Sequence, residues 1–186
     1  MTNLHTQERA FTQVLIGIAT YGIRACRRSL VLLILAGLLN HPSTALAKDF
    51  GPTQRFNRPG NLLIADQFNN RVVEITPAGN IVWSFGRGPN DFTAHSIVGC
   101  NDAQRVGPFT LMAGTGTPAG VIPQAPDGVA DNRVVLVDPF GRIVWQYGQF
   151  GVTGSDPNQL STPVQSTWLP NAHVLISDQG NNRVSS

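Results

Sequence analysis

Residues 71–86, RVVEITPAGNIVWSFG, occur a second time at residues 133–148 as RVVLVDPFGRIVWQYG. The two stretches align without gaps and are identical at nine of sixteen positions. Self-similarity of this kind is the sequence signature of a repeat architecture. We therefore treat the chain as several copies of one structural unit.

A second part of the unit extends the comparison to the end of the chain. Residues 62–72, LLIADQFNNRV, match residues 174–184, VLISDQGNNRV, at eight of eleven positions. The aligned arginines, Arg71, Arg133 and Arg183, are 62 and then 50 residues apart. The chain thus carries three copies of the unit.

Each copy divides into strands and turns. Residues 62–65 are a short apolar run, and residues 66–70 are rich in Asp and Asn, which favour turns. Residues 71–76 alternate β-branched and polar side chains, and a Pro-Ala-Gly-Asn turn separates them from the strand-like residues 81–85. The pattern predicts a three-stranded antiparallel meander. Since no stretch after residue 47 has convincing helical periodicity, the fold class is all-β.

Meanders that recur in this way indicate the blades of a β-propeller. The sequence from Leu160-Ser161-Thr162-Pro163 to Asn181-Asn182-Arg183-Val184 resembles the NHL repeat, and so does the first copy from Phe56 to Arg71. The resemblance covers most of residues 56–86 and 127–186, and its most specific element is Asp-x-x-Asn-Asn-Arg-Val. It implies an NHL-like propeller in residues 48–186.

The copies depart from the family pattern at three places. The first lacks an opening strand between Pro59 and Gly60, and the middle copy has residues 127–133 in place of a tight turn. The third stops just after Arg183 begins a strand. A ring of blades normally needs four to eight. We therefore expect an incomplete propeller whose remaining blades are missing from this chain.

The N-terminal 47 residues have the three parts of a secretory signal peptide. Three arginines between residues 24 and 28 precede an apolar run at 30–39, and the small-residue series Ala45-Leu46-Ala47 follows. This predicts a signal-peptide helix, cleavage after Ala47 and export to the periplasm or the extracellular space. The Arg27-Arg28 pair leaves the twin-arginine route open beside the general secretory one.

Membrane anchoring is the alternative for this segment. The apolar run is shorter than the roughly 20 helical residues that cross a bilayer. Residues 14–23 are also apolar, however, and would support an uncleaved anchor. After cleavage we expect no membrane span.

Charge argues against nucleic-acid binding. Without residues 1–47 the chain has 9 Lys and Arg against 10 Asp and Glu, so the net charge falls from +2 to −1. Binding to nucleic acid depends on clustered cations that neutralise phosphates. We expect no nucleic-acid partner.

An acidic and a basic residue recur in the repeat turn, as Asp66 with Arg71 and Asp178 with Arg183. Such pairs could bind an anion or a metal at one face. The favoured interpretation is structural, with an Asp that holds turn amides and an Arg that ties one blade to the next. In the middle copy, Asp127 or Asp131 must replace the aligned Asp.

Other repeated positions have the same two interpretations. Trp83 and Trp145 align, each two residues before an aromatic side chain, and could form a ligand platform or pack between sheets. We favour packing for both tryptophans. Asp138 belongs to the Asp-Pro-Phe-Gly turn of the second copy and is interpreted as structural.

Residues 92–132 depart from the repeat and are treated as an irregular insertion. Their Gly-rich run at 113–120 suggests a phosphate loop only faintly, because Pro118 and the prolines after it forbid the helix that would hold a phosphate. Irregular loops on rigid scaffolds usually carry the specific contacts. This segment is therefore where we look first for function.

The candidate catalytic residues are His95 and Asp102, both in that insertion. His173, beside a repeat turn, is expected to be exposed. Cys100 would be the only cysteine after cleavage, and is either buried, paired with another chain or separated from a missing partner.

The sequence supports two functions from different classes. The first is a secreted binding or scaffold module that recognises a protein, peptide or glycan through its blade loops, with no cofactor and no metal. The second, implied by resemblance to secreted arylsulfotransferase-like or lactonase-like propellers, is a transferase or hydrolase. Catalysis requires His95, an acid such as Asp102 and backbone donors to converge on one cavity.

Overall fold

The computed structural model describes residues 53–186 of the chain, so the predicted signal peptide at 1–47 and its possible use as an anchor lie outside the described residues. Within the described part, no helix is long and apolar enough to cross a membrane. The regular structure consists of strands and two single-turn 3₁₀ helices, which confirms the all-β class.

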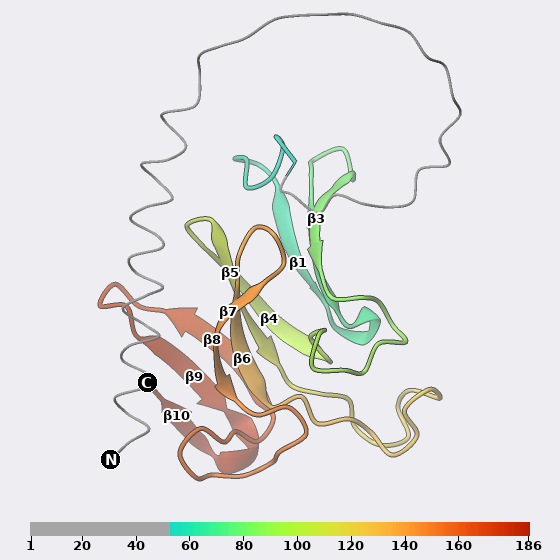
Figure 1. Ribbon diagram of the computed structural model, residues 1–186, viewed down its shortest axis with the longest axis vertical. Helices are drawn as coiled ribbons and strands as arrows, with labels where there is room; N and C mark the ends of the chain where they lie inside the picture. Colours follow the sequence, from blue (N-terminus) through green and yellow to red (C-terminus); the bar gives the residue numbers. More distant parts are fainter. Residues whose placement is uncertain (1–52) are drawn as a thin grey trace, which may run out of the picture. The chain divides into compact units, whose positions relative to one another are not determined.

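The strands form three antiparallel sheets, shown in Figure 1. The first sheet consists of β1 (Leu62–Asp66), β2 (Arg71–Ile75) and β3 (Ile81–Phe85). The middle sheet consists of β4 (Cys100–Val106), β5 (Phe109–Gly114), β6 (Arg133–Val137) and β7 (Ile143–Gly148). The third sheet consists of β8 (Pro163–Trp168), β9 (Val174–Asp178) and β10 (Arg183–Ser185). The short helices η1 (Gln67–Asn69) and η2 (Gln179–Asn181) lie in the repeat turns.

The first copy folds as its sequence pattern predicts. The expected strands at 62–65, 71–76 and 81–85 correspond to β1, β2 and β3, which pair in sequence order. No strand in the described residues precedes β1 in this sheet. The opening strand is therefore absent from the first sheet as described.

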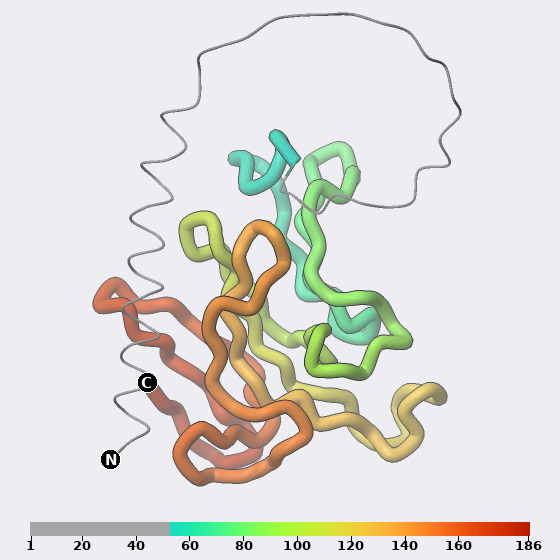
Figure 2. Tube along the Cα trace, in the orientation of Figure 1, coloured from blue at the N-terminus to red at the C-terminus, as the bar shows by residue number. Residues whose placement is uncertain are grey.

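The expected insertion at 92–132 is more regular than its sequence indicates. It contains β4 and β5, which pair with each other and, through β5, with β6. The residues Ala113 and Gly114, which open the glycine-rich run, end strand β5. Apart from the turn between β4 and β5, the irregular parts of this segment are residues 92–99 and 115–132, and residues 115–132 form the long projection traced in Figure 2.

The middle sheet lies between the other two, because β4 contacts both β1 and β8. Successive residues of a strand point to opposite faces of its sheet. In β6, the neighbours Val134 and Val135 are both fully buried, so both faces of the middle sheet are covered. A cluster that includes Val72, Trp83, Phe85, Met112 and Val135 fills the space between the first and middle sheets.

The repeat turns depend on asparagine. Asn70, Asn132 and Asn182 adopt φ values of 49°, 54° and 51°, in the left-handed region. Among residues with a side chain, Asn visits that region most readily. The preserved Asn before each Arg is thus a requirement of the backbone.

Candidate functional site

The recurring acid and base form an ion pair in every copy. Arg71 Nε lies 2.8 Å from Asp66 Oδ2, and Arg183 Nε lies 2.8 Å from Asp178 Oδ2. In the middle copy Arg133 Nε lies 2.6 Å from Asp131 Oδ1. Of the two candidates in that copy, Asp131 therefore replaces the aligned Asp, although it stands two residues before the Arg instead of five.

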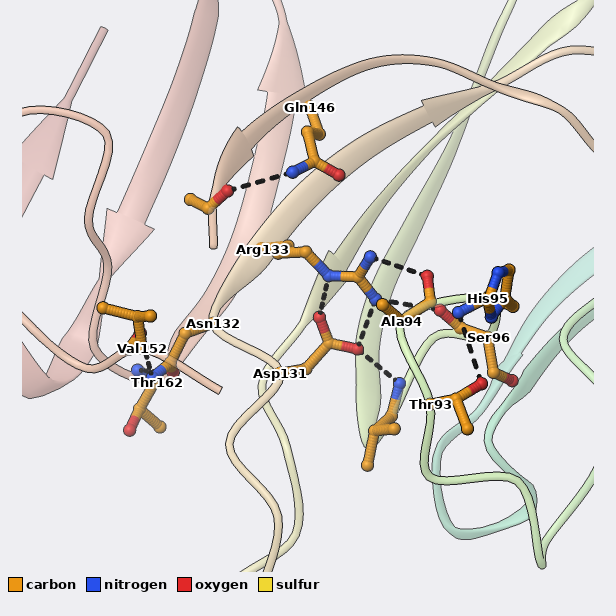
Figure 3. A network of polar contacts seen from close by, with 12 residues as sticks. Thr93, Ala94, His95, Ser96, Asp131, Asn132, Arg133, Gln146, Val152 and Thr162 are labelled. Carbon is orange, nitrogen blue, oxygen red and sulfur yellow. Dashed lines mark hydrogen bonds and ion pairs between the residues drawn. The ribbon is translucent and has the colours of Figure 1, made fainter. Parts of the chain in front are cut away.

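The middle pair is the most buried and has the most partners (Figure 3). Asp131 and Arg133 are 0% and 1% exposed. Arg133 donates through its two terminal nitrogens to the carbonyls of Ala94 and Ser96, at 2.9 Å each. The Val98 amide donates to Asp131 Oδ2 at 2.6 Å. The pair therefore ties the segment that arrives from the first sheet onto the middle sheet.

The third pair repeats this connection. Arg183 donates to the carbonyls of Ser155 and Gln159, at 2.8 and 2.9 Å, which lie on the segment arriving from the middle sheet. Arg71, whose sheet is preceded by no other in the described chain, bonds only Asp66 among residues 53–186. These contacts support the structural interpretation of the repeated pairs.

The pKa values of Asp131 and Asp66 are shifted in opposite directions. For Asp131, loss of solvent raises the pKa above its ordinary value and outweighs the opposing bonds and charge of Arg133. For Asp66, burial again acts to raise the pKa, but hydrogen bonds from Arg71 and Asn69 together with the Arg71 charge lower it overall. The same turn chemistry thus gives shifts of opposite sign.

Two asparagines join adjacent sheets, a role that the sequence analysis missed. Asn70 Oδ1 accepts a hydrogen bond from the Gly99 amide at 3.1 Å, just before β4. Asn132 Oδ1 accepts one from the Thr162 amide at 2.8 Å, just before β8. The signal was present in the sequence, because an Asn precedes the Arg in all three copies.

A second missed cluster joins the first and middle sheets around Glu74, which is 2% exposed. Its carboxylate accepts hydrogen bonds from the Asn57 amide at 2.6 Å and from Arg105 Nη2 at 2.6 Å. The Arg105 guanidinium lies 4.5 Å from the Phe56 ring centroid and 4.9 Å from that of Trp83. Burial lowers the pKa of Arg105 against the opposing charge of Glu74. No repeat signal marks Glu74, because Leu136 occupies its position in the middle copy.

The repeated tryptophans are packed inside the protein. Trp83 and Trp145 are 7% and 9% exposed, which agrees with the interpretation as core and not with an open aromatic platform. The Trp83 indole nitrogen donates to the Pro139 carbonyl at 3.1 Å. Asp138 holds its turn by accepting hydrogen bonds from the amides of Phe140 and Arg142, at 2.9 Å each.

The two candidate catalytic residues occupy separate environments. His95 is exposed on the segment before β4, whereas Asp102 Oδ2 accepts a hydrogen bond from the Ser166 amide at 2.9 Å. Among the described residues, no hydrogen bond or ion pair joins His95 to Asp102. His173 is exposed beside its turn.

Cys100 is fully buried and free. Burial raises the pKa of its thiol well above the ordinary value, so the thiol stays protonated. Of the alternatives left open by the sequence, the structure matches the buried cysteine. A protonated and inaccessible thiol is a poor nucleophile.

The concave feature that stands out is a depression at the base of residues 115–132, which we call the loop pocket. Its volume is about 320 Å³. Six of its lining residues have polar side chains and six are small or apolar: Thr115, Gly116, Thr117, Pro118, Ala119, Asp127, Gly128, Val129, Ala130, Asn132, Thr153 and Thr162. None of His95, Asp102 and Cys100 is among them.

Hydrogen bonds hold the walls of the loop pocket. Thr117 and Val129 exchange both backbone hydrogen bonds, at 2.7 and 2.8 Å, and the Gly120 amide donates to the Pro126 carbonyl at 2.9 Å. Asn132 Nδ2 donates to Thr153 Oγ1 at 2.8 Å. This hydrogen bond holds Thr153, which lines the pocket opposite residues 115–130. The pocket is therefore preformed between the loop and the segment that leads to the third sheet.

Two groups of the lining are chemically distinctive. Asp127 is its one ionisable side chain and is exposed. The buried Thr117 hydroxyl has no hydrogen-bond partner within residues 53–186. Groups of three or more His, Cys, Asp or Glu that could hold a metal ion do not occur among the described residues. No protein-family model matches the chain, and a search of curated proteins finds no match.

Proposed function

We propose that the chain is an exported, NHL-like β-propeller module that binds a ligand in the loop pocket. Three sheets built from one repeat lie side by side, and the same Asp–Arg pairs and Asn bridges join each sheet to its neighbour. Radial repetition of short antiparallel sheets is the propeller principle. Export is proposed from the signal-peptide pattern of residues 1–47.

The observation that carries the proposal is the loop pocket itself. It is a preformed hollow on the irregular segment of a rigid β scaffold, where specific contacts are usually placed. Ligand sites range from about 300 to 1,000 Å³. At about 320 Å³, the loop pocket fits one side chain of a peptide or one unit of a glycan.

The lining favours a polar ligand without negative charge. The carboxylate of Asp127 attracts ammonium or guanidinium groups and accepts hydrogen bonds from hydroxyls. The exposed Thr153 adds a hydroxyl that accepts a hydrogen bond from Asn132 Nδ2, which leaves its own hydrogen to donate to such a partner. We therefore propose a glycan unit or a cationic or hydroxyl side chain of a peptide as the bound group.

Binding is favoured over catalysis because the lining offers no acid–base pair. It contains one carboxylate, and no His, Cys or Lys. A hydrolase or transferase site needs a nucleophile and a base within hydrogen-bond reach of each other. His95 and Asp102 do not supply this pair at the loop pocket.

A glycan array and a peptide array probed with the full chain test the proposal. We expect saturable binding to members of one array, and Asp127→Asn should weaken it about tenfold or more because a hydrogen bond to a charged group is lost. Asp156→Asn is the matched control, since Asp156 is exposed and lies outside the lining. Equal binding by the wild type and Asp127→Asn, or no binding to either array, would refute the loop pocket as the ligand site.

Export has its own test. The N-terminus of the secreted protein should begin at Lys48, as N-terminal sequencing can determine. Recovery of an intact Met1 form from the membrane fraction would contradict cleavage and favour the anchored alternative.

A further inference from the structure

Most carboxylates of the described chain have a partner. Hydrogen bonds or ion pairs within residues 53–186 engage the side chains of Asp66, Glu74, Asp91, Asp102, Asp131, Asp138 and Asp178. The two carboxylates without a partner in this part of the chain are those of Asp127 and Asp156, and both residues are exposed. Asp127 belongs to the lining of the loop pocket, and Asp156 does not. The pocket therefore carries a negative charge that no side chain of the described residues neutralises.

The two chain segments that form the loop pocket contain no basic residue. Residues 115–132 and 149–162 include Asp127, Asp131 and Asp156, but no Lys, Arg or His. The nearest arginine in the sequence, Arg133, is 1% exposed and paired with Asp131 (Figure 3). A cation in the pocket is thus attracted by Asp127 and meets no exposed positive charge from either segment. An anion would be repelled.

The hydrogen-bond donors of the lining are largely used within the chain. Six lining residues donate their amide hydrogens to other residues: Thr115, Gly116, Thr117, Gly128, Val129 and Thr162. Asn132 donates both hydrogens of its side-chain amide, to the Val152 carbonyl at 3.1 Å and to Thr153 Oγ1 at 2.8 Å. The Thr115 hydroxyl donates to the Pro163 carbonyl at 2.6 Å, which leaves its oxygen to accept. A ligand group that only donates therefore fits this lining best.

We propose that the loop pocket holds a protonated amine or a guanidinium, such as the end of a Lys or Arg side chain, with the Asp127 carboxylate as its counter-charge. The inference rests on the proposed function and selects one of the ligand classes named there. Both cations have several donors and no acceptor, whereas the hydroxyls of a glycan need donors as well. The apolar lining residues Pro118, Ala119 and Val129 suit the aliphatic stem that carries such a cation.

Blocked tripeptides that differ only in the central residue test the class of ligand by calorimetry on the full chain. The Lys and Arg peptides should bind saturably. The Nε-acetyl-lysine peptide keeps the stem without the charge and should bind at least about tenfold more weakly. Free n-butylammonium, which is the side chain alone, distinguishes the source: affinity equal to that of the Lys peptide assigns the site to a small amine, and weaker affinity assigns it to a peptide. Either result supports a cation site.

Charge at Asp127 should account for the preference. Asp127→Asn should bind the Lys and acetyl-lysine peptides with similar affinity, whereas Asp156→Asn should keep the preference of the wild type. Raising the ionic strength from about 0.01 to about 1 M shortens the Debye length from about 30 to about 3 Å. Binding of the Lys peptide should weaken accordingly, and binding to Asp127→Asn should change less.

Two glycine variants test whether the cation binds in the loop pocket. Gly128 and Gly120 have φ values of 74° and 75°, so alanine is strained to the same degree at both. A Cβ at Gly128 would lie 2.6 Å from the Thr117 carbonyl oxygen, whereas one at Gly120 meets nothing within 4 Å. Gly128→Ala should therefore distort the pocket wall and weaken binding of the Lys peptide. Gly120→Ala, the matched control, should bind as the wild type does.

The results separate this inference from the proposed function. Equal affinity for the Lys and acetyl-lysine peptides, or a preference for a Ser peptide or a neutral glycan, would overturn the inference. If Gly128→Ala abolishes binding of that neutral ligand, the loop pocket is still the ligand site and the proposed function stands. Binding that neither Gly128→Ala nor Asp127→Asn weakens would overturn both, and so would the absence of binding to every ligand.

Discussion

The last two strands of the first sheet and the last two strands of the middle sheet lie in different surroundings, although their stretches 71–86 and 133–148 are identical at nine of sixteen positions. Arg71 and Arg133 begin the aligned stretches, and each pairs with an aspartate. The Arg71 side chain is 37% exposed and, among the described residues, bonds only the Asp66 carboxylate, whereas the Arg133 side chain is 2% exposed and also bonds two carbonyls of the preceding segment. The motif is the same, and the neighbouring sheet determines what it contributes.

This difference shows why the same repeat position contributes different amounts to the free energy of unfolding in different sheets. An exposed ion pair contributes about 0–1 kcal/mol, whereas loss of one partner from a buried pair costs about 3–5 kcal/mol. Arg183, 32% exposed with two carbonyl partners, lies between these limits. Sequence identity among the three copies therefore does not imply equal importance.

The largest expected effect concerns the tryptophans. Unlike the arginines, they are buried in both the first and the middle sheet. Trp83→Ala and Trp145→Ala should each lower the free energy of unfolding by about 3–5 kcal/mol, because each removes a large packed ring. Urea unfolding measures both. Phe140→Ala, at a 45% exposed turn position, should cost below about 0.5 kcal/mol. A loss at only one tryptophan would show that the two sheets do not use this position in the same way.

The next effect isolates the contact between the first and middle sheets. Glu74→Gln keeps the shape of the side chain but leaves the half-buried Arg105 charge without its counter-charge. We expect a loss of about 2–3 kcal/mol in the free energy of unfolding. Arg142→Ala removes a pair whose arginine is 73% exposed and should cost at most about 1 kcal/mol. Equal losses in the two variants would contradict the claim that a buried ion pair contributes more to stability than an exposed one.

The smallest effect is the pH dependence of the first-sheet pair. Since the folded-state pKa of Asp66 is lowered below the ordinary value of an aspartate, its stabilisation is present above that ordinary value and is lost as the pH falls through the folded-state pKa. Asp66→Asn should therefore reduce the loss of stability on acidification below about pH 4. Thermal unfolding between pH 2 and 6 checks this, with Asp156→Asn as control. A steeper acid loss in Asp66→Asn would reverse the assigned sign.

Much of the fold could be predicted because the decisive signals are local. The alternation of residues 71–75 and the turn at 77–80 predict the hairpin that β2 and β3 form. Strand β4 could not be found in this way, since its sequence CNDAQRV has few apolar residues. Its polar side chains form hydrogen bonds with the neighbouring sheets. Asp102 bonds Ser166 of β8, and Arg105 bonds Glu74 of the first sheet.

The candidate site was less accessible to sequence reasoning. Repetition marked the Asp–Arg pairs, and it left Asp127 and Asp131 as alternatives because the turn of the middle copy is longer. The Glu74–Arg105 pair occurs once and has no spacing rule. The loop pocket depends on how residues 115–132 fold back, through contacts such as Thr117 with Val129, which no periodicity encodes.

Double-mutant cycles on the arginine–aspartate pairs test the central claim most directly. The claim is that the contribution of one repeated ion pair to stability depends on how far a neighbouring sheet buries it. Each cycle combines the Arg→Ala and Asp→Ala variants and reads the coupling in the free energy of unfolding. The account predicts the largest coupling for Arg133 with Asp131, an intermediate one for Arg183 with Asp178, and at most about 1 kcal/mol for Arg71 with Asp66. Equal coupling in the three copies, or the largest in the first, would contradict it.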